Sequence, residues 1–171
     1  DQLKLKLLTA EDIPQRPALL NSIYLEYYTY HYDSAMVYVN RGLSLSESEN
    51  NAYYTTLNKI NRAAVLSTGG FYSQSEELLE DIKKRGVPKQ LKQYYYYTRT
   101  WLYNYWEAFS NKSEFMDYYH KKKFENLKLT VEVTSSKDVA LHAYLSGELA
   151  FLTNPMSKTV LQFYTKALMN S

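Results

Sequence analysis

The chain contains no cysteine among its 171 residues. A disulfide scaffold, a thiolate metal site and a cysteine nucleophile are therefore excluded. Glycine and proline are also scarce, with 5 and 4 residues respectively. Because these two residues interrupt helices, their scarcity favours long helices.

An excess of one charge sign is lacking as well. The chain has 20 Lys and Arg against 18 Asp and Glu, for a net charge of +2. Such a balance does not indicate a nucleic-acid or membrane-surface protein, and we expect no nucleic acid to bind through this domain. No apolar run approaches the roughly 18 residues that cross a bilayer. Since the chain begins at Asp1 rather than Met, we expect a fragment of a longer protein, with any membrane anchor outside it.

The histidines give no sign of a catalytic or metal site. His31, His120 and His142 stand far apart. None has a carboxylate at metal-ligand spacing, such as that of His-Glu-x-x-His. No Ser, His and Asp form a group that the sequence places together. We therefore expect no metal, no cofactor and no enzymatic activity.

Apolar residues, which make up 45% of the chain, recur at steps of three and four along most of it. This spacing predicts amphipathic helices. The expected start signals are Asp33, the capping box Ser73–Glu76, Ser135–Ser136 and Ser157; Gly69–Gly70 and Gly86 with Pro88 are the expected stops. The prediction is one all-α domain over 1–171, built from four antiparallel helical hairpins at about 11–46, 50–86, 88–134 and 136–170.

The second helices of these hairpins repeat. Their starts align at Ala35, Ser75, Tyr118 and Val160, with spacings of 40, 43 and 42 residues. A period in this range is typical of an array of helical hairpins, in which each unit buries its apolar face by stacking on the next.

Two segments resemble tetratricopeptide repeats. Gly70–Leu79 resembles the turn and second helix of that motif, with Ala63 at its small-residue position, and Ser157–Leu168 resembles its helix end. The resemblance implies a right-handed tetratricopeptide-like array, an α-solenoid. The period exceeds the usual ~34 residues, and Tyr118 and Trp106 stand where small residues are expected. We therefore expect a distorted third hairpin.

The segment Tyr24–Val39, with its Tyr-Asp-Ser-Ala run, is similar to a family of membrane-anchored regulators from Bacteroidetes, and Asp1–Lys4 resembles the end of that family's preceding helix. In that family a tetratricopeptide-like sensory part is usually followed by a membrane segment, a coiled coil and a helix-turn-helix DNA-binding domain. The resemblance implies the sensor part of a transcriptional regulator in signal transduction. It also implies the periplasmic side of the inner membrane, with the cytoplasm as the alternative.

Tyrosine is abundant, with 19 residues, and four are consecutive at Tyr94–Tyr97. Successive helical residues lie 100° apart, so these four rings cannot all face one core. Tyr96, Arg99, Tyr103 and Glu107 follow steps of three or four on one face. That face predicts a binding groove in which rings stack on a ligand and polar groups donate or accept hydrogen bonds. The alternative is that all sides of this helix pack against other helices.

Tyr24 and Tyr28 could extend such a groove, the alternative being ordinary core packing. The leading hypothesis is a non-enzymatic sensory module that binds a peptide or protein segment, or a glycan fragment. The alternative is an assembly scaffold whose terminal hairpins pack against the rest of the chain or against a second copy in a homodimer.

Overall fold

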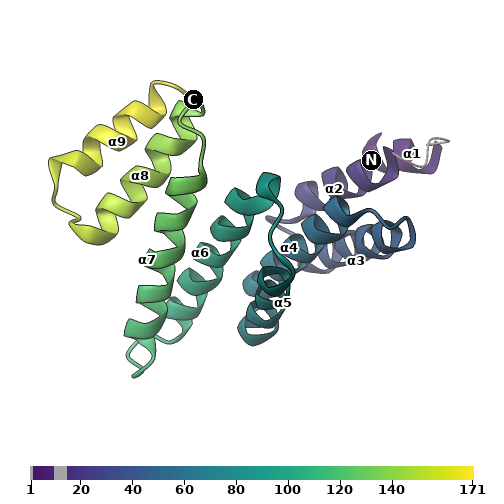
Figure 1. The fold of residues 1–171 in the computed structure, drawn as a ribbon, viewed down its shortest axis with the longest axis horizontal. Coiled ribbons are helices and arrows are strands. Elements are labelled where there is room, and N and C mark those ends of the chain that lie inside the picture. Colours follow the sequence, from purple (N-terminus) through teal and green to yellow (C-terminus); the bar gives the residue numbers. More distant parts are fainter. Residues whose placement is uncertain (1, 10–14) are drawn as a thin grey trace. The chain divides into compact units, whose positions relative to one another are not determined.

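The computed structural model describes residues 2–9 and 15–171, and the regular structure in these ranges is helical (Figure 1). The elements are α1 (Gln2–Thr9), α2 (Arg16–Tyr27), α3 (Tyr32–Ser48), α4 (Ala52–Thr68), α5 (Tyr72–Arg85), the 3₁₀ helix η2 (Lys89–Leu91), α6 (Lys92–Phe109), α7 (Met116–Val133), α8 (Val139–Thr153) and α9 (Lys158–Leu168). The all-helical, tetratricopeptide-like prediction is confirmed. Residues 11–14 of the first expected hairpin lie outside the described residues.

The chain divides into two compact units, Asp1–Pro88 and Lys89–Ser171. In the first unit, α2 pairs with α3 and α4 with α5, and α3 packs against α4. In the second, α6 pairs with α7 and α8 with α9, and α7 packs against α8. Each unit therefore stacks two consecutive hairpins, as expected for a helical repeat.

The core of the first hairpin is built on an aromatic and aliphatic cluster. Tyr24 of α2 meets Ala35 and Val39 of α3 and Val65 of α4, and all four are almost fully buried. The second hairpin approaches closely at Gly42 of α3. A Cβ at that glycine would lie only 2.7 Å from a side-chain oxygen of α4, so the absence of a side chain lets the two helices meet.

Ser75 has a different role from the one predicted for its segment. Helix α5 begins at Tyr72, and its N-cap residue, Phe71, makes no side-chain capping bond, so the predicted capping box is wrong. Ser75 is instead fully buried. Its hydroxyl donates to the carbonyl of Ala63 at 2.8 Å and lies 2.9 Å from the hydroxyl of Ser67. The small residue at this repeat position therefore holds α5 against α4.

The other helix starts were predicted with mixed success. His31, not Asp33, caps α3, and its ring nitrogen accepts from a first-turn amide at 3.2 Å. Asp138, not Ser135–Ser136, caps α8 in the same way. The prediction of Ser157 as the start of the last helix is confirmed, since it caps α9.

Both predicted glycine stops are confirmed. Helix α4 ends at Thr68, and Gly70 follows with φ +82°. Helix α5 ends at Arg85, and Gly86 follows with φ +89°. These positive φ values suit glycine, which has no Cβ to clash with the backbone.

The third hairpin departs from the repeat where bulky residues replace small ones. Tyr118 is 52% exposed, so it does not occupy the buried position of Ala35 and Ser75. Its neighbour Tyr119 points into the hairpin and stacks on Trp106 of α6, with ring centroids 4.5 Å apart. Two stacked rings therefore fill the crossing that small residues occupy in α4 and α5.

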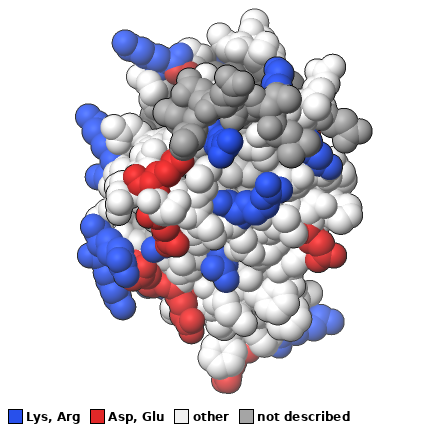
Figure 2. All heavy atoms as spheres, turned by 90° about the vertical axis from the view of Figure 1, so that its right-hand side faces the viewer, with Lys and Arg blue, Asp and Glu red and all other residues white. Residues whose placement is uncertain are grey.

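Charges of both signs are scattered over the surface displayed in Figure 2, in line with the small net charge. Within residues 2–9 and 15–171, no helix combines the length and the apolar character that crossing a bilayer requires. The same residues contain no cluster of His, Asp and Glu suited to hold a metal ion.

Candidate functional site

Three of the six residues predicted to line a groove lie in the core. Tyr24 and Tyr103 are fully buried, and Arg99 is only 6% exposed. Their side chains are packed inside helical hairpins, so they do not form an open surface. Tyr24 belongs to the first unit, and the other two belong to the second.

Arg99 is held by neutral oxygens on two helices of the second unit. Its Nε donates to Oδ1 of Asn126 on α7, and its two terminal nitrogens donate to the hydroxyls of Tyr95 and Tyr103, each at 3.0 Å. The guanidinium carbon also lies 5.7 and 5.6 Å from the centroids of the two rings. Tyr95, Arg99 and Tyr103 follow one another at steps of four on α6, so they share the face that packs into the hairpin.

Glu107 is also engaged within this hairpin. Its carboxylate pairs with Nζ of Lys123 at 2.5 Å and with Nδ1 of His120 at 2.7 Å, both on α7. Burial raises the pKa of the Glu107 carboxyl, but the hydrogen bonds and charges of Lys123 and His120 outweigh it and hold that pKa below its ordinary value. Glu107 therefore links α6 to α7.

The last two predicted residues lie at the edge of the core and are partly buried. Tyr28 packs against the cluster around Tyr24, with ring centroids 5.4 Å apart. The ring of Tyr96 meets Tyr95 edge-on at 5.2 Å. Both rings therefore contribute to packing.

A groove does exist in the second unit, on a neighbouring face of α6. We call it the α6–α8 groove. It is lined by Tyr97, Thr100, Trp101 and Asn104 of α6, Lys123 and Leu127 of α7, and Tyr144, Leu145, Glu148 and Leu152 of α8. Its cavity volume is about 60 Å³. A second depression of about 370 Å³ continues it, because the two share Tyr97 and Leu145.

The face of α6 that lines the groove is rotated about the helix axis relative to the predicted face, by roughly the turn of one residue. Tyr97, Trp101 and Asn104 each follow a member of the predicted stripe by one or two positions, and one position turns the helix by 100°. The run of four tyrosines did include Tyr97, and Trp101 follows it at a helical step. Tyr144 and Glu148 show the same step of four on α8. The sequence analysis did not identify Tyr97, Trp101, Tyr144 and Glu148 as a group. No local sequence signal shows which face of a helix its neighbours leave uncovered.

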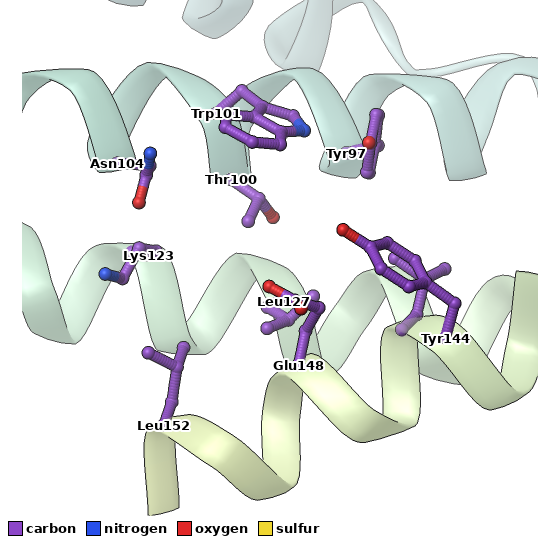
Figure 3. A pocket seen from close by; sticks show the side chains of 10 residues that line it. Tyr97, Thr100, Trp101, Asn104, Lys123, Leu127, Tyr144, Glu148 and Leu152 are labelled. Atoms are coloured by element: carbon purple, nitrogen blue, oxygen red, sulfur yellow. The ribbon is translucent and has the colours of Figure 1, made fainter. Parts of the chain in front are cut away.

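In Figure 3 the side chains of Tyr144 and Glu148 extend from α8 toward α6, where Tyr97 and Trp101 lie along the helix that borders the groove. Tyr164 of α9 donates its hydroxyl to Oε1 of Glu148 at 2.6 Å. This bond places the carboxylate at the side of the groove.

The tyrosines around Glu148 remain neutral. Burial, then the hydrogen bond and charge of Glu148, raise the pKa of Tyr164. Burial, followed by the charges of Glu148 and Tyr97, raises the pKa of Tyr144. Both hydroxyls therefore keep their protons at neutral pH, and that of Tyr164 donates to Glu148. The groove combines aromatic walls with one carboxylate, an arrangement that can bind a ligand through ring contacts and hydrogen bonds.

A family model described as the SusR N-terminal TPR domain matches residues 1–171, where TPR stands for tetratricopeptide repeat. The chain belongs to this family. TPR domains generally mediate protein–protein interactions through the surfaces of their stacked helices, and they are typically not catalytic. For this SusR-type TPR domain, comparison with curated proteins and with solved structures finds no match.

Proposed function

We propose that this domain is the sensory part of a membrane-anchored transcriptional regulator and binds a peptide or protein segment in the α6–α8 groove. The binding event takes place on the periplasmic side of the inner membrane and biases the regulator. Membership of the SusR N-terminal TPR domain family supports an interaction module. The regulator and its location rest on the similarity of the Tyr24–Val39 segment to the regulators from Bacteroidetes.

The observation that carries the proposed binding site is the aromatic lining shared by two helices. Tyr97 and Trp101 of α6 face Tyr144 of α8 across an open depression. Their rings supply a large contact area at a small cost in conformational entropy, and a hydroxyl or indole N–H at each rim can bond a peptide backbone. A groove between two helices fits a chain segment better than the flat face of a folded partner.

Selection from a random peptide library tests this proposal. We expect the domain to select peptides whose binding is lost in Trp101→Ala and in Tyr144→Ala. The matched control is Tyr53→Ala, because Tyr53 is a partly exposed tyrosine of α4 that does not line the groove. Circular dichroism melts establish that each variant is folded. Selection of no peptide, or of peptides equally bound by all variants, would refute a segment-binding groove.

The full-length gene product tests the regulatory part of the proposal. A membrane helix followed by a helix-turn-helix domain, downstream of this domain, is the expected arrangement. A downstream sequence without either would remove the regulator from the proposal and leave the interaction module.

A scaffold role is the second candidate, and the outer surface of α9 favours it. Leu161, Leu168 and Met169 are 71%, 77% and 81% exposed. Leu168 also lines an almost wholly apolar depression between α8 and α9. Apolar groups exposed together on a soluble domain commonly mark an interface. Light scattering after size exclusion would show a dimer that Leu168→Glu separates, whereas a monomer at all concentrations would exclude self-assembly.

A further inference from the structure

We propose that the α6–α8 groove recognises a cationic side chain, that of lysine or arginine, presented by the bound segment. This inference rests on the proposed function, because it names the chemistry of the segment that the groove accepts. It follows from three features of the lining: its charge, its rings and its hydrogen-bonding groups.

The lining carries one lysine and one glutamate, and their neighbours decide which charge is left for a ligand. Lys123 is the one cation of the lining, and it is neutralised by Glu107 in a pair whose side chains are only 12% and 13% exposed. Glu148 is the one carboxylate of the lining. Within the described part of the chain no Lys, Arg or His forms an ion pair with it. The groove therefore holds one negative charge without a counter-charge, and an incoming cation would supply it.

The rings strengthen this preference. Tyr97 and Trp101 meet at an interplanar angle of 79°, with centroids 6.2 Å apart, so they form two walls in different orientations. Tyr144 stands across from them on α8 (Figure 3). A cation over the face of a tryptophan or tyrosine ring is attracted by the ring quadrupole, most strongly where water is excluded. Three rings around a carboxylate thus form a site that favours an ammonium or guanidinium group.

Hydrogen bonding agrees with a donor-rich ligand. Oε1 of Glu148 accepts from Tyr164, and its second oxygen remains for a ligand. The hydroxyl of Thr100 donates to the carbonyl of Tyr96 at 3.0 Å, so towards the groove it acts as an acceptor. Asn104 also lines the groove, and Figure 3 draws its amide oxygen on the side of the gap. Lysine and arginine carry three and five N–H donors and no acceptor, so they match such a lining.

An acidic segment is disfavoured for the same reasons. Its carboxylate would meet Glu148 directly. Lys123 would have to leave Glu107 in order to bind it, and of its contacts with Lys123 and His120 the largely buried Glu107 carboxylate would then keep only the one with His120. A neutral apolar side chain would fill the aromatic space but would bury the charge of Glu148 with only the neutral hydroxyl of Tyr164 beside it.

The direct test uses Trp101 as a fluorescent reporter. The chain has two tryptophans, so Trp106→Phe leaves Trp101 alone and keeps a ring to stack on Tyr119. The probes are N-acetyl-arginine amide, N-acetyl-lysine amide and, as a neutral analogue of similar shape, N-acetyl-citrulline amide. We expect the emission of Trp101 to change saturably with the two cations and not with citrulline.

The matched variants are Glu148→Gln and Glu132→Gln. Both remove one negative charge, but Glu132 is an exposed residue of α7 outside the groove lining. Glu148→Gln is expected to weaken the binding of both cationic probes about tenfold, and Glu132→Gln is expected to leave it unchanged. Equal binding of citrulline and arginine, or equal weakening by the two variants, would overturn the inference.

The peptide selection separates this inference from the proposed function. Selected peptides enriched in Lys or Arg, with affinity that depends on Glu148, support both. Peptides that need Trp101 but carry no basic residue leave the segment-binding groove standing and overturn the cation preference. A saturable response to the arginine probe with no selected peptide supports a cation site and overturns the binding of a protein segment.

Discussion

Replacing Arg99 with methionine tests whether this residue is structural, as its burial indicates, or part of a ligand surface. Methionine keeps much of the aliphatic stem and its packing, but it removes the guanidinium. The hydrogen bonds to Asn126, Tyr95 and Tyr103 disappear. The amide of Asn126 is fixed by its own bond to the Lys122 carbonyl at 2.7 Å, so its oxygen cannot turn away to another donor.

The magnitude follows from two terms that destabilise the variant and one that opposes them. Hydrogen bonds to a charged group contribute about 1.5–3 kcal/mol each. Removing the guanidinium also removes its desolvation penalty, which is several kcal/mol for a buried ion. The oxygen of Asn126 then stays buried without this donor, at a cost of about 1–3 kcal/mol. We therefore expect Arg99→Met to lower the free energy of unfolding by about 2–4 kcal/mol.

Urea unfolding followed by tryptophan fluorescence is the suitable assay. Trp101 and Trp106 both lie on α6, so the signal reports on the second unit. Lys128→Met is the control, because Lys128 is an exposed residue of α7 and its replacement should change the unfolding free energy by less than about 0.5 kcal/mol. Arg99→Lys should also be destabilised, since an ammonium group cannot reproduce the planar fork. An Arg99→Met variant as stable as the unchanged chain would refute this reasoning.

Two further predictions concern the second unit. The depressed pKa of the Glu107 carboxyl gives stability that is present above about pH 4.5, the ordinary value, and is lost as the pH falls through the lowered pKa. In urea titrations the unfolding free energy of the unchanged chain should therefore exceed that of Glu107→Gln at pH 7, and the difference should shrink as the pH falls below about 4.5. A constant difference would contradict the ion pair. A Cβ at Gly147 would lie 2.8 Å from the ring of Tyr164, so Gly147→Ala should cost about 1–3 kcal/mol. Combining it with Tyr164→Leu should recover part of that loss in thermal melts, and a Gly147→Ala variant with an unchanged melting temperature would disprove the contact.

The sequence predicted the helices well because their signals are local. A glycine with positive φ ends α4 and another follows α5, and both stood in the sequence as Gly70 and Gly86. The residues that cap the helix N-termini were harder to predict. His31 and Asp138 are the N-cap residues, whereas Asp33 and Ser135–Ser136 were predicted. Several polar residues within one turn can accept from the free amides, and the backbone geometry determines which of them does so.

The predicted site residues differ from those that line the α6–α8 groove. The aromatic helix was identified, but its open face was assigned to the stripe through Arg99 and Tyr103. Arginine is rarely buried unless it is paired, so the sequence favours an exposed position for Arg99. Its hydrogen-bond partner Asn126 lies 27 residues away on α7. No local sequence pattern predicts a hydrogen bond between residues so far apart.

The alignment of the repeats was also correct at some positions and wrong at another. Ala35 and Ser75 were aligned correctly as buried small residues. Tyr118 was aligned with them by counting, whereas Tyr119 takes the inward position and stacks on Trp106. The N-terminal turn of α7 begins one residue later than the count implied, and one residue is enough to turn a ring from the core to the solvent.

The sequence by itself therefore determined that the chain forms helices, where most of them end, and that they pair into repeated hairpins, because helical period and glycine stops depend only on neighbouring residues. Only the tertiary structure decided which of several amphipathic faces is buried and which lines the groove. On a helix as rich in tyrosine as α6, every face is apolar enough to pack, so the choice depends on which side α7 and α8 cover.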